Sequence, residues 1–211
     1  MKVGDVALCS WRARRRFLMP RVLLIDPLPS PVVERLRPSF PASVGFDVVP
    51  TPSEEDLAQY GAEAEILLVI HRKVDARLLS FVPHVRLVQR VGVGYDNLDL
   101  DALQAAGVVA AYTPGANAVA VAEHTILLML ALLKRFVAAE SAVRQGDWPT
   151  MELFQAGVGD LANATVGLVG FGNTGRAVAE RLLPFGSRLL YTARHAVNPT
   201  MEQQFSMRYA S

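Results

Sequence analysis

The chain has 211 residues, of which 51% are hydrophobic and 19% are charged. This composition excludes a disordered protein and is sufficient for the core of one large domain or two small ones. The 21 basic and 20 acidic residues nearly cancel, which excludes a general nucleic-acid binder or membrane-surface binder. The single cysteine, Cys9, excludes an internal disulfide and predicts a reducing, cytoplasmic location.

The basic residues are concentrated at the N-terminus. Residues 1–21 hold six basic residues and one acidic residue, Asp5. An Arg-rich, acid-poor start is typical of an organellar targeting segment, but this one has a single serine and no clear amphipathic repeat. We therefore interpret residues 1–18 as a disordered basic extension, with organellar targeting as the alternative, and expect the folded part to begin near Met19.

Short apolar runs alternate with polar, helix-like segments from residue 21 onward. The runs, which suit strands buried on both faces, are Val22–Ile25, Val44–Val49, Ile66–Ile70, Arg86–Gln89 and Val108–Tyr112. The helix-like segments between them are Pro31–Arg37, Ser53–Tyr60, Asp75–Phe81 and Asp99–Ala106. Ser53 and Asp99 suit helix N-caps, and Gly107 suits a helix end. The alternation predicts an α/β domain with a parallel sheet of flavodoxin-like size and helices on both faces.

A long helix is predicted next, from Ala118 to Arg144, with Asn117 at its start. We expect this helix to link two domains and to pack against the second. Its uncharged core, residues 125–133, is far shorter than the ~20 residues that a bilayer requires, so we predict no membrane span. Residues 147–162 have weak periodicity and are predicted to form a loop with a short turn.

A glycine-rich turn follows the next apolar run, Thr165–Val169, and opens a helix-like segment. Its residues are Gly170, Gly172, Asn173, Thr174 and Gly175, in the pattern G-x-G-x-x-G. In this context the first glycine allows a tight turn, the second lets the backbone approach a pyrophosphate, and the third lets helix and strand pack closely. Free N–H groups at the helix N-terminus would bind the phosphates, which predicts a dinucleotide site. The alternative is a glycine turn that binds nothing.

The end of the following strand, Arg188–Tyr191, indicates which dinucleotide is bound. An acidic residue about 20 residues after the motif would bind the ribose 2′-hydroxyl and repel a 2′-phosphate. This segment instead carries Thr192, Arg194 and His195. Arg194 suits fork-like pairing with a phosphate, so we predict NADP(H) in preference to NAD(H). The alternative is that Arg194 and His195 are ordinary solvated loop residues.

Four stretches together carry a resemblance to a known family. They are Val91–Asn97 (VGVGYDN), Tyr112–Asn117 (YTPGAN), Val121–Thr125 (VAEHT) and Val166–Gly175. From Met19 to the last residue the chain resembles the D-isomer-specific 2-hydroxyacid dehydrogenases, especially the glyoxylate/hydroxypyruvate reductase-like branch. The resemblance implies a flavodoxin-like substrate domain over residues 19–117. It also implies a Rossmann NAD(P)-binding domain over residues 118–211, which would be incomplete.

The resemblance implies hydride transfer between a nicotinamide cofactor and a small 2-keto or 2-hydroxy acid. The backbone N–H groups of Val93 and Gly94 would bind the substrate carboxylate, since glycine-flanked donors suit an anion. Asn117 would also hydrogen-bond this carboxylate. The alternatives are that Gly92 and Gly94 only turn the strand and that Asn117 only caps the helix. Dimers formed largely through the nucleotide domain are usual in the family, so we expect a homodimer.

The family takes its catalytic arginine, glutamate and histidine from the later half of the nucleotide domain, and none of them has a matching position in this chain. After Thr165 we expect one strand–helix–strand unit and the start of another helix. The strands Val166–Val169 and Arg188–Tyr191 would then leave a long unpaired apolar edge. We therefore interpret the chain as a C-terminally truncated dehydrogenase that is inactive alone. The alternative is a shortened non-catalytic protein that binds a nucleotide or a partner and regulates a full-length relative.

The histidines give no strong signal of a further site. His124 lies among the apolar residues of the long helix, so we expect a core histidine and not a catalyst. His71 follows a strand end, where ligands of open α/β sheets bind, but the neighbouring Arg72 and Lys73 indicate a solvated loop. His84 is predicted to lie in an exposed turn. No spacing of His, Cys, Asp and Glu is typical of a metal site, so we expect no metal.

Overall fold

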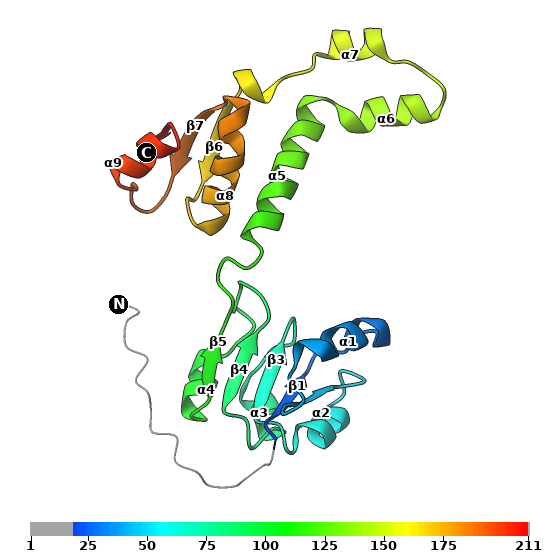
Figure 1. Ribbon diagram of the computed structural model, residues 1–211, viewed down its shortest axis with the longest axis vertical. Coiled ribbons are helices and arrows are strands. Elements are labelled where there is room, and N and C mark those ends of the chain that lie inside the picture. The colour runs from blue at the N-terminus through cyan, green and yellow to red at the C-terminus, as the bar shows by residue number, and fades with distance from the viewer. Residues whose placement is uncertain (1–18, 211) are drawn as a thin grey trace. The chain divides into compact units, whose positions relative to one another are not determined.

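The computed structural model describes residues 19–210. The predicted basic extension, residues 1–18, lies outside the described residues. The chain divides between Thr113 and Pro114 into two compact units. Each unit has its own parallel sheet (Figure 1). Each unit also has its own apolar core.

Five parallel strands form the sheet of the first unit. They are β1 (Arg21–Leu24), β2 (Gly45–Val48), β3 (Ile66–Val69), β4 (Leu87–Arg90) and β5 (Val109–Ala111). Their order is β2-β1-β3-β4-β5, which is the flavodoxin-like order. The predicted α/β class and parallel sheet are therefore confirmed, and each strand lies within one residue of its predicted ends.

Helices connect these strands. They are α1 (Ser30–Leu36), which the 3-10 helix η1 (Arg37–Ser39) follows, α2 (Glu54–Gly61), α3 (Ala76–Ser80) and α4 (Leu100–Ala105). Of these, α2, α3 and α4 each begin at a capping side chain. The side chains of Ser53, Asp75 and Asp99 each accept a backbone N–H in the first turn of α2, α3 and α4. The predicted caps at Ser53 and Asp99 are thus confirmed. Gly107, at φ 69°, follows α4 in the left-handed conformation that glycine favours.

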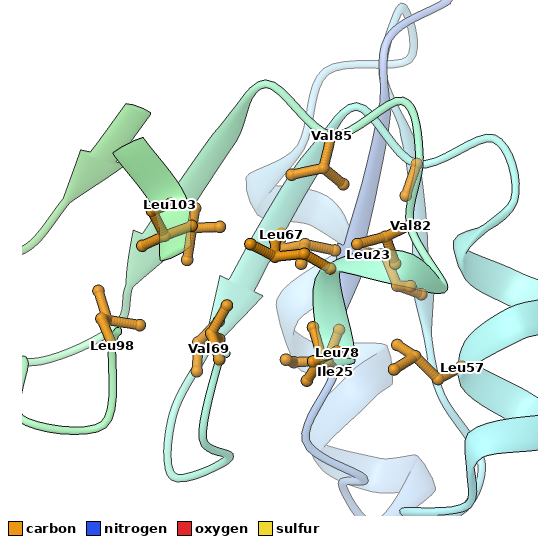
Figure 2. Packing of buried hydrophobic residues seen from close by; sticks show 14 of the residues in the cluster. Leu23, Ile25, Leu57, Leu67, Val69, Leu78, Val82, Val85, Leu98 and Leu103 are labelled. Carbon is orange, nitrogen blue, oxygen red and sulfur yellow. The ribbon is translucent and has the colours of Figure 1, made fainter. Parts of the chain in front are cut away.

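Helices cover both faces of this sheet, as the alternating pattern predicts. On one face, Leu67 and Val69 are fully buried against side chains of α2, α3 and α4 (Figure 2). On the other face, Val22, Leu24 and Phe46 pack against the apolar side of α1. Strands buried on both faces explain why their sequences are continuous apolar runs without alternation.

The second unit begins with helices that the sequence pattern merged into one. They are α5 (Ala118–Leu133) and α6 (Phe136–Arg144), followed by α7 (Thr150–Ala156) and the 3-10 helix η2 (Leu161–Asn163). The prediction of one helix over 118–144 is wrong, because Arg135 adopts a left-handed conformation at φ 49° and ψ 40°. Its guanidinium donates to the carbonyls of Ala156 (2.5 Å) and Gly157 (2.7 Å). The end of α7 therefore holds the break between α5 and α6 in place. This end lies within residues 147–162, which the sequence predicts to be mainly loop.

α5 buries only a narrow stripe of its surface. The buried residues, Ala118, Ala122 and Ile126, recur every four positions and so lie on one side of the helix. His124 is off this stripe and is exposed, so the expectation of a core histidine is wrong. Among the residues that the structure describes, no helix is both long and apolar enough to cross a membrane.

Three parallel strands form the second sheet, in the order β6-β7-β8. They are β6 (Thr165–Val169), β7 (Arg188–Thr192) and β8 (Met207–Tyr209), and they are connected by α8 (Asn173–Leu182), η3 (Leu183–Phe185) and α9 (Pro199–Gln204). The prediction that β7 lacks a neighbour on one side is wrong, because β8 pairs with it in parallel on the side opposite β6. Phe205 and Met207 anchor this pairing, since both are buried in the core of the unit.

One face of this sheet is covered and the other is not. Val166 and Leu168 of β6 are buried beneath α5 and α8, whereas the alternate residues Thr165, Gly167 and Val169 are exposed. The order β8-β7-β6 matches the 3-2-1 half of a classic Rossmann sheet. Among the described residues, no strand pairs with the outer edge of β6.

Candidate active site

The turn after β4 lies at the carboxyl end of the first sheet. Gly92 has φ +152°, a conformation that favours glycine. The Thr113 hydroxyl accepts a hydrogen bond from the Gly92 N–H at 3.0 Å and donates one to the Gly92 carbonyl at 2.9 Å. The Thr113 N–H donates to the same carbonyl at 3.0 Å. Thr113, two residues beyond β5, therefore fixes the start of the turn.

The next two residues of this turn present free backbone donors. Val93 and Gly94 are both exposed, and within residues 19–210 neither N–H has a hydrogen-bond acceptor. Neighbouring free amides of this kind form an anion-binding concavity. One acid lies close by, because a Cβ on Gly94 would be 3.1 Å from Oδ1 of Asp96. The turn therefore suits a small anion that binds on the side away from the Asp96 carboxylate.

The other residues considered for the substrate site lie on different elements. Asn117, in the second unit, precedes α5 and is exposed; its carbonyl accepts the Val121 N–H, but its side chain makes no capping hydrogen bond. Its amide is therefore available to a ligand. His71 is exposed after β3, and its N–H donates to Asp26 at 2.9 Å. His84 is also exposed.

The glycine turn of the second unit connects β6 to α8. Gly170 has φ +95°, and its N–H donates to the Thr192 carbonyl at 2.8 Å, so the turn is joined to the end of β7. A Cβ on Gly175 would lie 2.5 Å from the Gly170 carbonyl oxygen, which leaves room for glycine alone. A Cβ on Gly172 would meet no atom within 4 Å. The space beside Gly172 is therefore open to a ligand.

The N-terminus of α8 faces this space with unused donors. No side chain caps the helix, and among the described residues no acceptor is found for the N–H groups of Gly172, Asn173, Thr174 or Gly175. These donors and the positive end of the helix dipole suit phosphate oxygens. The Asn173 side chain packs against Gly115, where a Cβ would be 2.8 Å from its Nδ2.

The segment after β7 exposes the two basic residues predicted to select the cofactor. Thr192 ends β7 and is half-buried, whereas Arg194 and His195 are exposed. Neither basic side chain has a partner within the described residues. Both are therefore free to bind an anionic group placed beyond the end of β7.

Tyr191 and Tyr209 hold the segment after β7 in place, a role that the sequence did not reveal. The buried Tyr191 hydroxyl donates to Oε1 of Glu202 at 2.8 Å and accepts the Val197 N–H at 2.9 Å. The Tyr209 hydroxyl donates to the Ala193 carbonyl at 3.1 Å. Desolvation, and then the hydrogen bond to Glu202, raise the pKa of Tyr191 above its ordinary value. Both tyrosines look like ordinary core residues in the sequence, and only their contacts reveal this role.

No metal centre emerges from the part of the chain that the structure describes. Over residues 19–210, no three His, Cys, Asp or Glu side chains are grouped as a metal ion requires.

Comparisons with known proteins identify relatives of this chain. Residues 22–208 match the family described as D-isomer specific 2-hydroxyacid dehydrogenase, catalytic domain. Glyoxylate/hydroxypyruvate reductase B from Klebsiella pneumoniae is 35% identical over 91% of this chain and 59% of its own length. The protein of the same name from Escherichia coli O6:H1 is 34% identical over 92% of this chain and 60% of its own length.

A solved structure extends the likeness to the fold. The glyoxylate reductase from Paecilomyes thermophila is 26% identical, with a TM-score of 0.67, and the match covers 92% of this chain and 60% of that enzyme. The chain thus spans about three-fifths of the length of the relatives that it matches. Because the family match covers nearly all of the described residues, the chain belongs to the D-isomer specific 2-hydroxyacid dehydrogenase family.

Proposed function

We propose that this chain carries the carboxylate-binding and dinucleotide-binding parts of an NAD(P)-dependent reductase of small 2-keto acids, of the glyoxylate or hydroxypyruvate class. The observation that supports it most directly is the glycine turn of the second unit. Its free amides from Gly172 to Gly175 and the open space beside Gly172 fit a pyrophosphate. When bound, the nicotinamide of such a cofactor supplies the hydride.

The second unit also favours NADP(H). Arg194 and His195 are exposed and unpaired beyond β7, and Thr192 offers a hydroxyl beside them. Glu202, an acid of the following helix α9, accepts a hydrogen bond from Tyr191. A guanidinium binds a 2′-phosphate through charge-assisted hydrogen bonds, whereas a carboxylate there would repel it.

The first unit supplies the donors for the substrate carboxylate. The N–H groups of Val93 and Gly94 are free and exposed, and they lie at the carboxyl end of the sheet, where open α/β sheets bind ligands. Asn117 of the second unit has a side-chain amide that makes no capping hydrogen bond and suits a carboxylate. These residues bind and orient; reduction also needs a cation to polarise the carbonyl and an acid to protonate the alkoxide.

The relatives named as reductases supply the substrate class, and no residue of this chain matches the family's catalytic arginine, glutamate or histidine. We therefore expect the 211-residue chain to bind a dinucleotide without turning over a keto acid. A non-catalytic protein that binds nucleotide and regulates a full-length relative is the second candidate, because binding through free backbone donors needs no catalytic group.

Cofactor titrations test this function directly. We expect the purified chain to enhance NADPH fluorescence and to bind NADH more weakly. Arg194→Ala should weaken NADPH binding about tenfold or more, because a charge-assisted hydrogen bond contributes about 1.5–3 kcal/mol, and should leave NADH binding nearly unchanged. Arg188→Ala is the matched control, since this exposed arginine lies at the opposite end of the same strand.

Three further results would contradict parts of this assignment. If the chain binds neither NADPH nor NADH, the assignment of a dinucleotide site is contradicted. Clear oxidation of NADPH with glyoxylate or hydroxypyruvate would show that the chain is catalytic alone and would exclude both the expected inactivity and the regulatory alternative. Equal loss of NADPH affinity in Arg188→Ala and Arg194→Ala would remove the role of Arg194 in cofactor choice.

A homodimer is the assembly that the second unit favours. Large apolar side chains are exposed on and beside α5, α6 and α7, among them Leu132, Val137, Trp148 and Phe154, which are 79%, 75%, 81% and 77% exposed. Exposed apolar surface of this extent is typical of an interaction site. A second copy of the chain would bury it, in keeping with the expectation of a dimer formed through the nucleotide domain.

A further inference from the structure

The turn after β4 is braced by an arginine that the proposed function does not use. Arg90 ends β4 and is half-buried. Its Nε donates to Oδ1 of Asn97 at 3.2 Å, and its Nη1 donates to the Val91 carbonyl at 2.6 Å. A Cβ on Gly92 would lie 2.6 Å from the same Nη1. The guanidinium therefore packs directly against the start of the turn.

Asn97 holds this arginine in place and connects it to a second loop. Its Oδ1 accepts from Arg90, while its Nδ2 donates to the Arg72 carbonyl at 2.8 Å. The backbone of Asn97 also takes part, because its carbonyl accepts the Val74 N–H at 2.9 Å. Both polar groups of the side chain are thus in use, and they join the loop after β3 to the turn after β4.

The loop after β3 is itself fixed by an aspartate at the end of β1. The Asp26 carboxylate accepts the N–H groups of Ile70 at 2.6 Å and of His71 and Arg72 at 2.9 Å each. Three backbone donors on one carboxylate leave this loop little freedom. The hydrogen bonds therefore run without interruption from β1 through the loop and Asn97 to Arg90.

The turn at the end of this network needs such support. Gly92 adopts a conformation that only glycine tolerates well, and Val93 and Gly94 are exposed and make no hydrogen bond through their N–H groups to the described residues. Thr113 holds Gly92 from the side of β5, and Arg90 packs against it from the side of β4. Free amides bind an anion well only when they are already oriented.

We propose that Arg90 and Asn97 are positioning residues that orient the Val93 and Gly94 amides for a carboxylate. This inference rests on the proposed function of the turn. Arg90 acts through its geometry, because its planar fork reaches both the Asn97 side chain and the Val91 carbonyl. A lysine keeps the charge but lacks the fork, so Arg90→Lys separates the effect of the charge from the effect of the geometry.

The experiment uses the intact chain with oxalate, a small dicarboxylate, as the probe. Amide NMR shifts of Gly92, Val93 and Gly94 are recorded without ligand and during an oxalate titration. We expect Arg90→Met to shift these amides in the free protein and to weaken oxalate binding about tenfold to a hundredfold, since misplaced binding groups lose affinity steeply. Arg90→Lys should not restore this affinity.

Two further variants refine the test. Asn97→Asp keeps an acceptor for Arg90 but removes the donor to the Arg72 carbonyl, so we expect the Gly92–Gly94 amides to shift as well. Arg77→Met is the matched control, because this exposed arginine of the first unit bonds Glu54 on the surface. Urea unfolding of every variant separates lost affinity from lost folding.

Each outcome decides the proposal. It is overturned if Arg90→Met and Asn97→Asp leave the turn amides unshifted in the free protein, or if Arg90→Lys binds oxalate as tightly as the natural chain. If Arg90→Met does not fold, Arg90→Lys and Asn97→Asp give the same two readouts. If the natural chain does not bind oxalate, the proposed carboxylate site fails, while the shifts in the free protein still support or overturn the positioning role.

Discussion

Individual glycines determine whether each turn can present its amides. At Gly92 the backbone lies at φ +152°, and at Gly170 it lies at φ +95°. At Gly175 the limit is space, because the carbonyl oxygen of Gly170 occupies the position that a side chain would need. The same residue type therefore satisfies a conformational requirement at two positions and a packing requirement at a third.

Gly175→Ala tests the packing requirement. The new Cβ would lie 2.5 Å from a backbone oxygen, so α8 must move away from β6. We expect the free energy of unfolding to fall by about 1–3 kcal/mol and NADPH affinity to fall with it, because the helix N-terminal amides are displaced. Urea unfolding and nucleotide fluorescence measure the two effects.

Gly167→Ala is the matched control for this substitution. A Cβ at this position of β6 meets no atom within 4 Å and is not at positive φ. We expect its unfolding free energy to stay within about 0.5 kcal/mol of the natural chain. Equal stability of the two variants would contradict the close contact between Gly170 and Gly175.

At the scale of elements, side chains distant in sequence decide where segments bend. Arg135 ends α5 by donating to carbonyls at the end of α7. Tyr191 in β7 holds the segment that carries Arg194 and His195, through hydrogen bonds with Val197 and with Glu202 in α9. In both cases one polar side chain forms hydrogen bonds with groups outside its own element. These hydrogen bonds fix a segment that lacks regular secondary structure.

The brace made by Tyr191 predicts a dependence of stability on pH. The pKa of Tyr191 is raised in the folded chain, so the folded state keeps this proton at a pH where the unfolded state, with a pKa near 10.0, has lost it. The free energy of unfolding must therefore fall as the pH rises past this value. Tyr191→Phe should be less stable at neutral pH, because two hydrogen bonds are lost, and should lose less stability in alkali.

Urea unfolding of both proteins at neutral pH and above pH 10 measures this difference. Tyr209→Phe is the comparison variant, because its hydroxyl braces the same segment through the Ala193 carbonyl. If Tyr191→Phe and the natural chain lose stability in parallel above pH 10, ionisation of the Tyr191 hydroxyl is not the cause of the loss.

At the scale of the whole molecule, two units with separate cores each carry one turn with free backbone amides. The first unit has a sheet covered on both faces, whereas the second has one covered face and an exposed set of apolar helix side chains. The second unit is therefore the part of the chain whose surface favours association.

Light scattering during size-exclusion chromatography tests this association. We expect a dimer that Leu132→Glu and Phe154→Glu convert to a monomer, because each places a charge on exposed apolar surface of α5 or α7. Val169→Glu is the control, since Val169 is 93% exposed but lies on β6. If only Val169→Glu dissociates the dimer, the association uses the sheet and not the helices.

The sequence alone determined the features that arise from neighbours along the chain. Apolar runs gave the strands of the first sheet, capping residues such as Ser53 and Asp99 gave helix starts, and the glycine spacing indicated the turn before α8. The family was also legible, because four short motifs in a fixed order are specific when taken together.

Only the tertiary structure decided features that depend on residues far apart in sequence. No local signal marks the break at Arg135, because its carbonyl partners lie 21 and 22 residues away. The exposure of His124 depends on which side of α5 is packed, and the pairing of β8 depends on the burial of Phe205 and Met207. The network of Asp26, Asn97 and Arg90 spans three strand ends that a parallel sheet brings to one edge. Periodicity along the chain records which residues are apolar, whereas hydrogen-bond partners are chosen only when the elements pack.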